Sequence, residues 1–173
     1  MPTATPAEPN RFAAIEPRQS QPLLTWRDVS DATDAVIART NKTLDLFDRD
    51  LLLTGWQSLS RFKLLRDAIV QRSVAVRLML CDTTTLRGDC PRVVSLLSTH
   101  AHKLSILGTR NQNSLNQSFV VADGQHLIFR PNMVQSSGSL EFENPSKSIV
   151  WITQFEVTWQ QGGRKIFAEA LGL

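Results

Sequence analysis

A short, nearly continuous apolar run in the middle of the chain constrains its fold more than any other feature. Residues 74–81 read Val-Ala-Val-Arg-Leu-Met-Leu-Cys. A run of this length, rich in aliphatic residues, suits a strand that is buried on both faces. Such strands occur in sheets that are covered by helices on both sides, so the run predicts an α/β protein.

Helical and extended patterns alternate around this run. Apolar spacing predicts helices at about 28–41, 57–72 and 91–99, and strands at 43–48 and 103–108. Pro91 suits the first turn of the third helix, because proline lacks the N–H that is unpaired there anyway. Helix followed by strand, three times over, is typical of crossover units and predicts a largely parallel sheet.

The pattern changes in the last third of the chain. Two apolar segments, 119–122 and 127–130, predict antiparallel strands, and the pair Asp123-Gly124 between them favours a two-residue hairpin turn. A short edge strand is predicted at 140–143. A final helix is predicted from Pro145 to the glycine pair 162–163, with a buried stripe made of Val150, Ile152, Phe155 and Trp159.

These elements predict one α/β domain with a mixed, mostly parallel sheet, flanking helices and a C-terminal β-hairpin plus helix. The length of 173 residues and the 42% hydrophobic content fit a single core. Five of the eight prolines lie in residues 1–24, which predicts a disordered Pro-rich leader. The domain is expected at 25–161 and a C-terminal tail at 162–173.

Cysteine content and hydropathy bear on the cellular compartment. Cys81 and Cys90 allow at most one disulfide, which favours a reducing environment. The chain has neither a run of about 20 apolar residues nor an N-terminal pattern typical of a signal peptide. We expect a soluble cytoplasmic protein, most simply a bacterial one, with no membrane contact.

The hairpin and the helix after it resemble a single phospholipase D-like domain over roughly residues 25–161. The features that carry the resemblance are an apolar strand ending in Asp123-Gly124, a return strand, and a helix with the aromatic spacing Phe155 to Trp159. In detail the chain is most similar to an uncharacterised bacterial branch whose domains occur alone or attached to acetyltransferase domains. Arg130-Pro131 matches the Arg-Pro pair that follows the return strand in that branch.

The resemblance implies a catalytic motif, His-x-Lys followed by four residues and Asp, that is degenerate here. With the aspartate on Asp123, the lysine position is Ser118 and the histidine position is Asn116. An asparagine amide has no lone pair basic enough to attack phosphorus, and a serine cannot neutralise developing negative charge. We therefore expect no catalytic residues, and Asp123 is equally well explained as a hairpin-turn residue.

Arg130 is the strongest candidate for a ligand-binding residue. A guanidinium at the end of the return strand could bind an anion in the former phosphate pocket, together with the predicted ligand-binding residues Asn116, Ser118, Asp123, Asn144 and Asp82. The structural alternative is a buried arginine paired with a carboxylate such as Asp82.

No metal or cofactor is predicted. Carboxylates that follow the strands, Asp48, Asp50 and Asp82, could hold Mg²⁺, but acidic residues also cap turns routinely. His100 and His102 lie two residues apart at a helix end, without further ligands at zinc spacing.

The sequence thus predicts a non-catalytic phospholipase D-like binding or interaction module that forms a homodimer or binds a partner protein. One alternative is a nucleic-acid-binding protein with a modest basic face, formed by Arg61, Lys63, Arg66, Arg72 and Arg77. The net charge of +3 is too small to indicate nucleic acid by itself. The other alternative is an enzyme of different chemistry that uses the strand-end carboxylates and Arg130.

Overall fold

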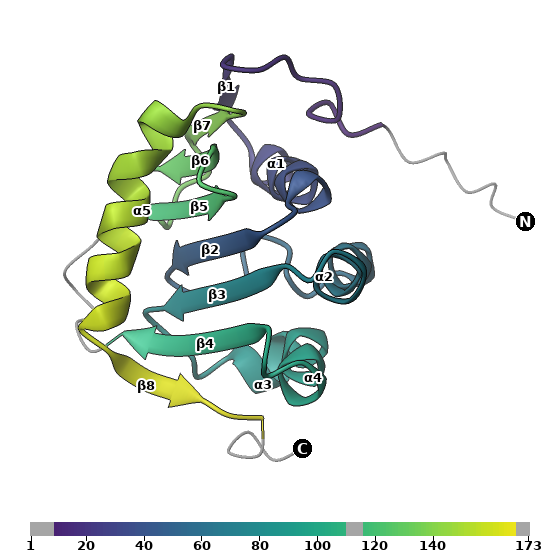
Figure 1. Ribbon diagram of the computed structural model, residues 1–173, viewed down its shortest axis with the longest axis vertical. Helices are drawn as coiled ribbons and strands as arrows, with labels where there is room; N and C mark the ends of the chain where they lie inside the picture. The colour runs from purple at the N-terminus through teal and green to yellow at the C-terminus, as the bar shows by residue number, and fades with distance from the viewer. Residues whose placement is uncertain (1–8, 110–115, 169–173) are drawn as a thin grey trace, which may run out of the picture.

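The computed structural model describes residues 9–109 and 116–168, and this part of the chain forms one eight-stranded sheet with five helices (Figure 1). The strands are β1 (Ser20–Leu23), β2 (Thr43–Asp48), β3 (Ala75–Leu80), β4 (Leu104–Thr109), β5 (Ser118–Ala122), β6 (His126–Arg130), β7 (Gly138–Glu141) and β8 (Gly163–Ile166). The helices are α1 (Trp26–Arg39), α2 (Leu59–Gln71), α3 (Leu86–Asp89), α4 (Pro91–Thr99) and α5 (Pro145–Gln160).

The strand order across the sheet is β1-β7-β6-β5-β2-β3-β4-β8. The three adjacent strands β2, β3 and β4 are parallel, and every other neighbouring pair is antiparallel. The predicted α/β class, with a mixed sheet and a C-terminal hairpin plus helix, is confirmed. The sheet is mostly antiparallel and not mostly parallel as predicted, because the hairpin and both edge strands pair in the antiparallel sense.

Helices cover both faces of the sheet. Figure 1 shows α1, α2, α3 and α4 on one face and α5 alone across the other. Side chains of β3 alternate between two apolar cores, with Val76 and Leu78 on the face of the first four helices and Met79 on the α5 face. This alternation explains why the run at 74–81 is apolar at nearly every position.

The predicted disordered leader is wrong for residues 9–24. Phe12 is only 2% exposed and lies in the core on the α1 side. Further along, β1 pairs with β7, and Arg18 donates its backbone N–H to the Phe142 carbonyl. Pro22 is tolerated in β1 because this strand forms an edge of the sheet, where a missing N–H costs no ladder bond. Residues 1–8 lie outside the described residues.

The predicted C-terminal tail also contributes to the sheet, up to residue 168, and residues 169–173 lie outside the described part. β8 pairs with β4 and forms the other edge. Gly163 allows this pairing, since a β-carbon there would overlap the Gly108 carbonyl oxygen. Sequence patterns missed β8 because two of its four residues are charged and one is glycine. Within the described residues, none of the helices combines the length and apolarity needed to cross a bilayer.

Candidate functional site

The predicted ligand residues Arg130 and Ser118 meet at the end of the sheet where the parallel strand β2 finishes. Ser118 begins β5 and Arg130 ends β6, and the two residues are direct partners in the antiparallel register. Arg130 Nη2 donates to Ser118 Oγ at 2.9 Å. It also donates to both carboxylate oxygens of Asp48, the last residue of β2, at 3.0 and 2.8 Å. These three side chains form the Arg130 cluster.

The rest of the Arg130 guanidinium is also engaged by the protein. Nη1 donates to the carbonyl oxygens of Met133 and Gln135, both at 2.9 Å, in the loop that follows β6. The guanidinium carbon lies 5.0 Å from the ring centre of Trp26, at the start of α1. Arg130 is 1% exposed and Asp48 is 3% exposed, so the cluster is closed to solvent.

Gly138 in β7 makes the close packing around Arg130 possible. A β-carbon at this position would lie 2.8 Å from Arg130 Cγ and would overlap the carbonyl oxygen of Phe129. Such contacts are too short for any side chain, so only glycine fits where β7 passes Arg130. Gly138 thus allows β7 to pass close to the backbone of β6 and to the aliphatic part of the Arg130 side chain.

Burial dominates the electrostatics of the Arg130 cluster. It raises the pKa of the Asp48 carboxyl from 3.8 to about 6, although the charge of Arg130 and hydrogen bonds from Arg49 and Ser118 act in the opposite direction. Near neutral pH the carboxylate is ionised and paired with the guanidinium. A buried pair of this kind is costly to break, because the remaining partner is an uncompensated charge.

Asp123 and Asn144 lie at the opposite end of the hairpin from Arg130. Asp123 is followed by Gly124 and Gln125 in a three-residue loop, not the predicted two-residue turn, because Ala122 pairs with His126. The Asp123 carboxylate accepts hydrogen bonds from the backbone N–H groups of residues 41–43 at 2.7–2.9 Å. It thereby fixes the connection between α1 and β2.

Asn144 precedes α5, and its side-chain amide donates to Glu141 at 3.2 Å. Its backbone N–H donates to Gln125 at the turn of the hairpin. Asn144 is therefore separated by the length of the strands from Arg130, so the structure does not bring the six predicted ligand residues into one site.

The last two predicted ligand residues lie near the Arg130 cluster without joining it. Asn116 is exposed, and its backbone carbonyl accepts from the Met133 N–H at 2.7 Å. Asp82 accepts from the backbone N–H and the hydroxyl of Thr84, and these two bonds lower the pKa of its carboxyl. The carboxylate that pairs with Arg130 is Asp48, not Asp82 as the structural alternative suggested.

The strand-end carboxylates each have a partner of their own. Asp48 pairs with Arg130, and Asp50 pairs with Arg49 and accepts from the Leu52 N–H. Among the residues that the structure describes, no group of three or more His, Cys, Asp or Glu side chains has a geometry that could hold a metal ion.

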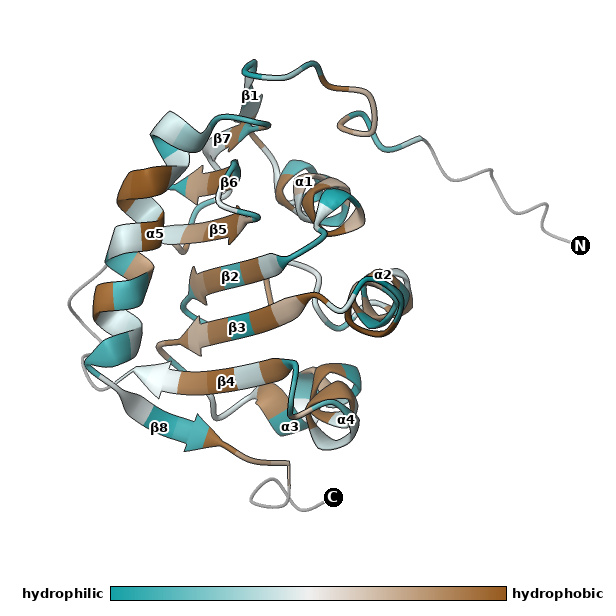
Figure 2. Ribbon diagram, in the orientation of Figure 1, coloured by the Kyte–Doolittle hydropathy of each residue, from teal (hydrophilic) through white to brown (hydrophobic). Residues whose placement is uncertain are grey.

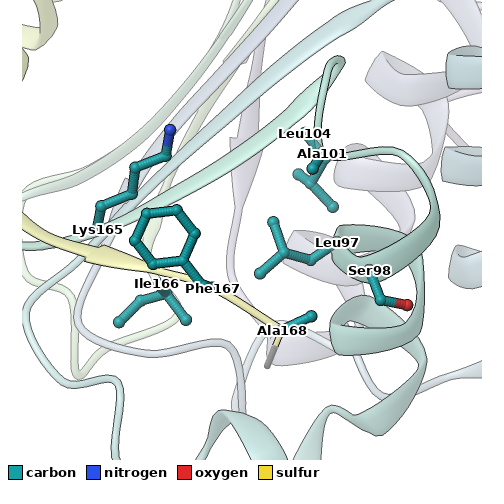
Figure 3. A pocket seen from close by; sticks show the side chains of 8 residues that line it. All are labelled: Leu97, Ser98, Ala101, Leu104, Lys165, Ile166, Phe167 and Ala168. Carbon is teal, nitrogen blue, oxygen red and sulfur yellow. The ribbon is translucent and has the colours of Figure 1, made fainter. Parts of the chain in front are cut away.

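A separate hollow of about 350 Å³ lies between the end of α4 and β8, near the β8 edge of the sheet (Figure 3). Its lining is mostly apolar and comes from residues 97–104 and 165–168. The cation in this lining is Lys165, whose ammonium nitrogen lies 5.3 Å from the ring centre of Phe167. The lining also contains the hydroxyl of Ser98, which Figure 3 shows on the α4 side of the hollow, away from Lys165.

Sequence reasoning missed Trp26, and it named Asp48 only as a strand-end carboxylate. Asp48 is the final residue of an alternating strand whose Leu44 and Leu46 face the α1 core. The alternation along β2, together with the return strand that ends in Arg130, is the signal that could have paired the two residues. No comparable pattern marks Trp26, because its contact depends on where α1 begins.

A family model described as a domain of unknown function, DUF7931, matches residues 25–167. The chain belongs to this family. No curated protein matches it.

Solved structures share the fold at low sequence identity. The Salmonella typhimurium phospholipase D family member Nuc has a TM-score of 0.60 and 12% identity, over 86% of this chain and 99% of Nuc. NucT from Helicobacter pylori has a TM-score of 0.56 and 10% identity, over 84% of this chain and 98% of NucT. The chain therefore has the phospholipase D-like fold, as its hairpin predicted.

The DNA-binding archaeal chromatin protein TrmBL2 has a TM-score of 0.64 and 11% identity, over 87% of this chain. The match spans 56% of TrmBL2, so this chain corresponds to about half of that protein. At this identity the likeness concerns the fold alone.

Proposed function

We propose that this chain is a non-catalytic phospholipase D-like domain that acts as a binding or interaction module. The closed Arg130 cluster carries the proposal. Ser118 stands at the lysine position of the phospholipase D motif, and its hydroxyl accepts from a guanidinium that is itself neutralised by Asp48. The position that should hold a phosphoryl oxygen is thus occupied by an internal ion pair.

The other two motif positions support the same conclusion. Asn116, at the histidine position, has an amide side chain that cannot act as a nucleophile toward phosphorus. Asp123 is engaged by three backbone N–H groups at the far end of the hairpin. Pairing two copies would not supply the missing groups, since each copy brings the same residues.

The test is hydrolysis of bis(p-nitrophenyl) phosphate and of single-stranded DNA, with an active phosphodiesterase as positive control. We expect rates no higher than buffer alone. Turnover that Asn116→Ala or Ser118→Ala abolishes would overturn the proposal. The two variants differ in burial, because Asn116 is exposed whereas Ser118 belongs to the buried cluster.

Nucleic-acid binding is the second candidate, because TrmBL2 shares the fold and binds DNA. The basic face predicted from sequence gives it little support. Arg61 is 1% exposed, Arg72 donates to the carbonyls of Ile37 and Thr40, and Arg77 pairs with Asp45. Retention on DNA that weakens steeply with salt would favour this candidate, and no retention at low salt would remove it.

An enzyme of different chemistry is less well supported, because Asp48 and Arg130 neutralise each other. An anion site at Arg130 would require the cluster to open. We keep the proposals that no metal or cofactor is needed and that the partner is a protein, including a second copy. Free, buried Cys81 and Cys90 are compatible with the proposed reducing cytoplasm, most simply of a bacterium.

A further inference from the structure

The two edge strands of the sheet, β1 and β8, differ in how well their outer sides are closed. In β1, Pro22 has no N–H to offer, and its carbonyl oxygen accepts from Arg11 Nη2 at 3.0 Å. β8 lies at the other rim of the sheet (Figure 1) and contains no proline. Among the residues that the structure describes, β4 alone pairs with it. The outward N–H and C=O groups of β8 therefore offer a ladder to a further strand.

Two adjacent cations, Arg164 and Lys165, lie on β8, and both are exposed. Neither forms an ion pair with another residue in the described ranges 9–109 and 116–168. Lys165 lies opposite Leu107, which belongs to the core on the α5 face. Arg164 points to the other face, because successive side chains of a strand alternate. Each face of this edge thus presents one positive charge.

An apolar surface follows the two cations along the chain. Ile166 lines the hollow of about 350 Å³ beside α4. Phe167 lies against the Lys165 side chain, with its ring centre 5.3 Å from the ammonium nitrogen, and is 54% exposed. Figure 2 shows the same change, from hydrophilic along β8 to hydrophobic at its end. The edge is therefore cationic first and apolar next.

The two cations disfavour a second copy of β8 at this edge. In the antiparallel register that pairs all four residues of one β8 with those of another, Arg164 of each copy opposes Lys165 of the other. Like charges directly opposite each other on neighbouring strands are destabilising. Acidic residues at these positions would make both contacts attractive, so charge complementarity favours an acidic segment as the occupant.

The exposed apolar side of α5 does not define a partner in this way. Val150 is 62% exposed there, although the sequence pattern places it in the buried stripe. Both charged residues of α5 are already paired, Lys147 with Glu141 and Glu156 with Arg77. Of these two surfaces, β8 is the one whose charges specify the chemistry of a partner.

We propose that the outer edge of β8 binds an extended segment of a partner protein by strand addition, and that this segment carries two acidic residues next to two apolar ones. The inference rests on the proposed interaction function and specifies the chemistry of the partner. The acidic residues lie opposite Arg164 and Lys165, and the apolar ones opposite Ile166 and Phe167, so that one apolar side chain enters the hollow. Backbone hydrogen bonds supply the affinity in this mode of recognition, and the side chains supply the specificity.

A peptide with this pattern tests the site. In the antiparallel sense the segment reads apolar-apolar-acidic-acidic, so the probe is fluorescently labelled Thr-Val-Leu-Glu-Glu-Thr, titrated with the full chain and followed by anisotropy. We expect saturable binding. A peptide of the same composition with the two glutamates separated should bind at least about tenfold more weakly. No saturable binding of the first peptide, or equal binding of both, would overturn the proposal.

A charge exchange tests the contacts with the two cations. Arg164→Glu with Lys165→Glu should weaken binding at least about tenfold, because two attractive contacts become repulsive. This variant should instead bind the peptide in which lysines replace both glutamates. Lys63→Glu with Arg66→Glu is the matched control, since it changes the net charge equally at exposed positions of α2, and should bind like wild type. Equal weakening by both double variants would contradict a site at β8. Both variants should keep the circular dichroism of wild type, as the substituted residues are exposed.

N-methylation of the peptide tests the backbone ladder. Alternate residues of a strand direct their N–H groups to the same side. Methylating one alternate set of the peptide should therefore abolish binding, whereas methylating the other set should leave it nearly unchanged. Equal effects of the two sets would rule out strand addition.

Two further measurements exclude other occupants of the edge. Single-stranded oligothymidylate should not displace the labelled peptide, and displacement would reveal a general anion surface in place of a peptide site. Deletion of residues 169–173 should not be needed for binding. Binding that requires this deletion would assign the edge to the chain's own C-terminus and overturn the proposal.

Failure of this inference is distinguishable from failure of the proposed function. A protein that neither hydrolyses phosphodiesters nor binds the peptide rejects the β8 site alone. Hydrolysis of phosphodiesters rejects the non-catalytic role, whether or not the peptide binds.

Discussion

The clusters around Arg130 and Arg61 are built alike, although only the first was predicted from the sequence to bind a ligand. Each guanidinium is 1% exposed. Arg130 contacts Asp48, Ser118 and Trp26, and Arg61 contacts the equivalent set, Asp34, Ser30 and Trp56. Each also donates to backbone carbonyls, those of Met133 and Gln135 for Arg130 and those of Ser30 and Thr54 for Arg61.

Arg61 joins α1, the loop after β2 and α2, and it has no place in the phospholipase D motif. The recurrence of the same arrangement there indicates that such a cluster serves to fix elements of this fold to one another. The two clusters differ in solvent access. The Asp34 side chain is 22% exposed and that of Asp48 is 4% exposed, so removal of the arginine should cost more at Arg130.

The largest expected effect is that of Arg130→Met. The substitution leaves the Asp48 carboxylate buried without its counter-ion, so the free energy of unfolding should fall by about 3–5 kcal/mol. The double variant Arg130→Met with Asp48→Leu removes both charges and should regain most of that loss. Urea unfolding followed by circular dichroism measures all three proteins. A single variant as stable as wild type would contradict the structural role.

The pH dependence of Asp48 comes next. Its carboxyl has a pKa of about 6 in the folded protein and an ordinary value of 3.8, so the folded state binds the extra proton between these two pH values. Stability contributed by this group therefore falls as pH rises from about 4 to about 6, by at most about 3 kcal/mol.

Asp48→Asn isolates this contribution. The stability of wild type minus that of the variant should be larger at pH 4.5 than at pH 7. Urea unfolding midpoints of both proteins at the two pH values would measure this difference. An identical difference at the two pH values, or one of opposite sign, would contradict the raised pKa.

Arg61→Met should have a smaller effect than Arg130→Met, a loss of about 2 kcal/mol, because Asp34 can regain water when its partner is removed. Burial lowers the pKa of the Arg61 guanidinium, whereas the charge of Asp34 and its hydrogen bond act to raise it. The same urea measurement ranks the two arginines. Equal or reversed losses would remove the distinction between the closed and the partly open cluster.

Asp123→Asn should have the smallest effect, a loss of about 1 kcal/mol. Asparagine tolerates the φ of 53° at this position and keeps one oxygen to accept from residues 41–43. Asp123→Ala should cost more, since it leaves all three N–H groups without that acceptor. Thermal unfolding of both variants checks this order, and a loss for Asp123→Asn as large as that for Arg130→Met would contradict it.

Periodicity was sufficient for the regular elements, because burial determines their pattern. The strand predicted at 43–48 is β2, and the helix predicted at 91–99 is α4. The edge strands β1 and β8 could not be predicted in this way. One contains a proline and the other two charged residues, and both depend on pairing with strands distant in sequence.

The candidate site was predictable as a list of residues and not as an arrangement. Placing Arg61 on a basic face failed because its charge was taken to mean exposure, although it shares the buried helix face of Leu65 and Ala68. Its partners Ser30 and Asp34 come from a different helix. The likeness of Asp123 to a motif residue was informative about the fold. Its carboxylate nevertheless serves the connection before β2.

The most direct test of the Arg130 assignment is a titration with inorganic phosphate at constant ionic strength, monitored by NMR through the side-chain Nε–Hε signal of Arg130. If the guanidinium is committed to Asp48, Ser118 and two backbone carbonyls, this signal should not move. A saturable shift of the Arg130 signal would show that the cluster opens to an anion, and would contradict the account.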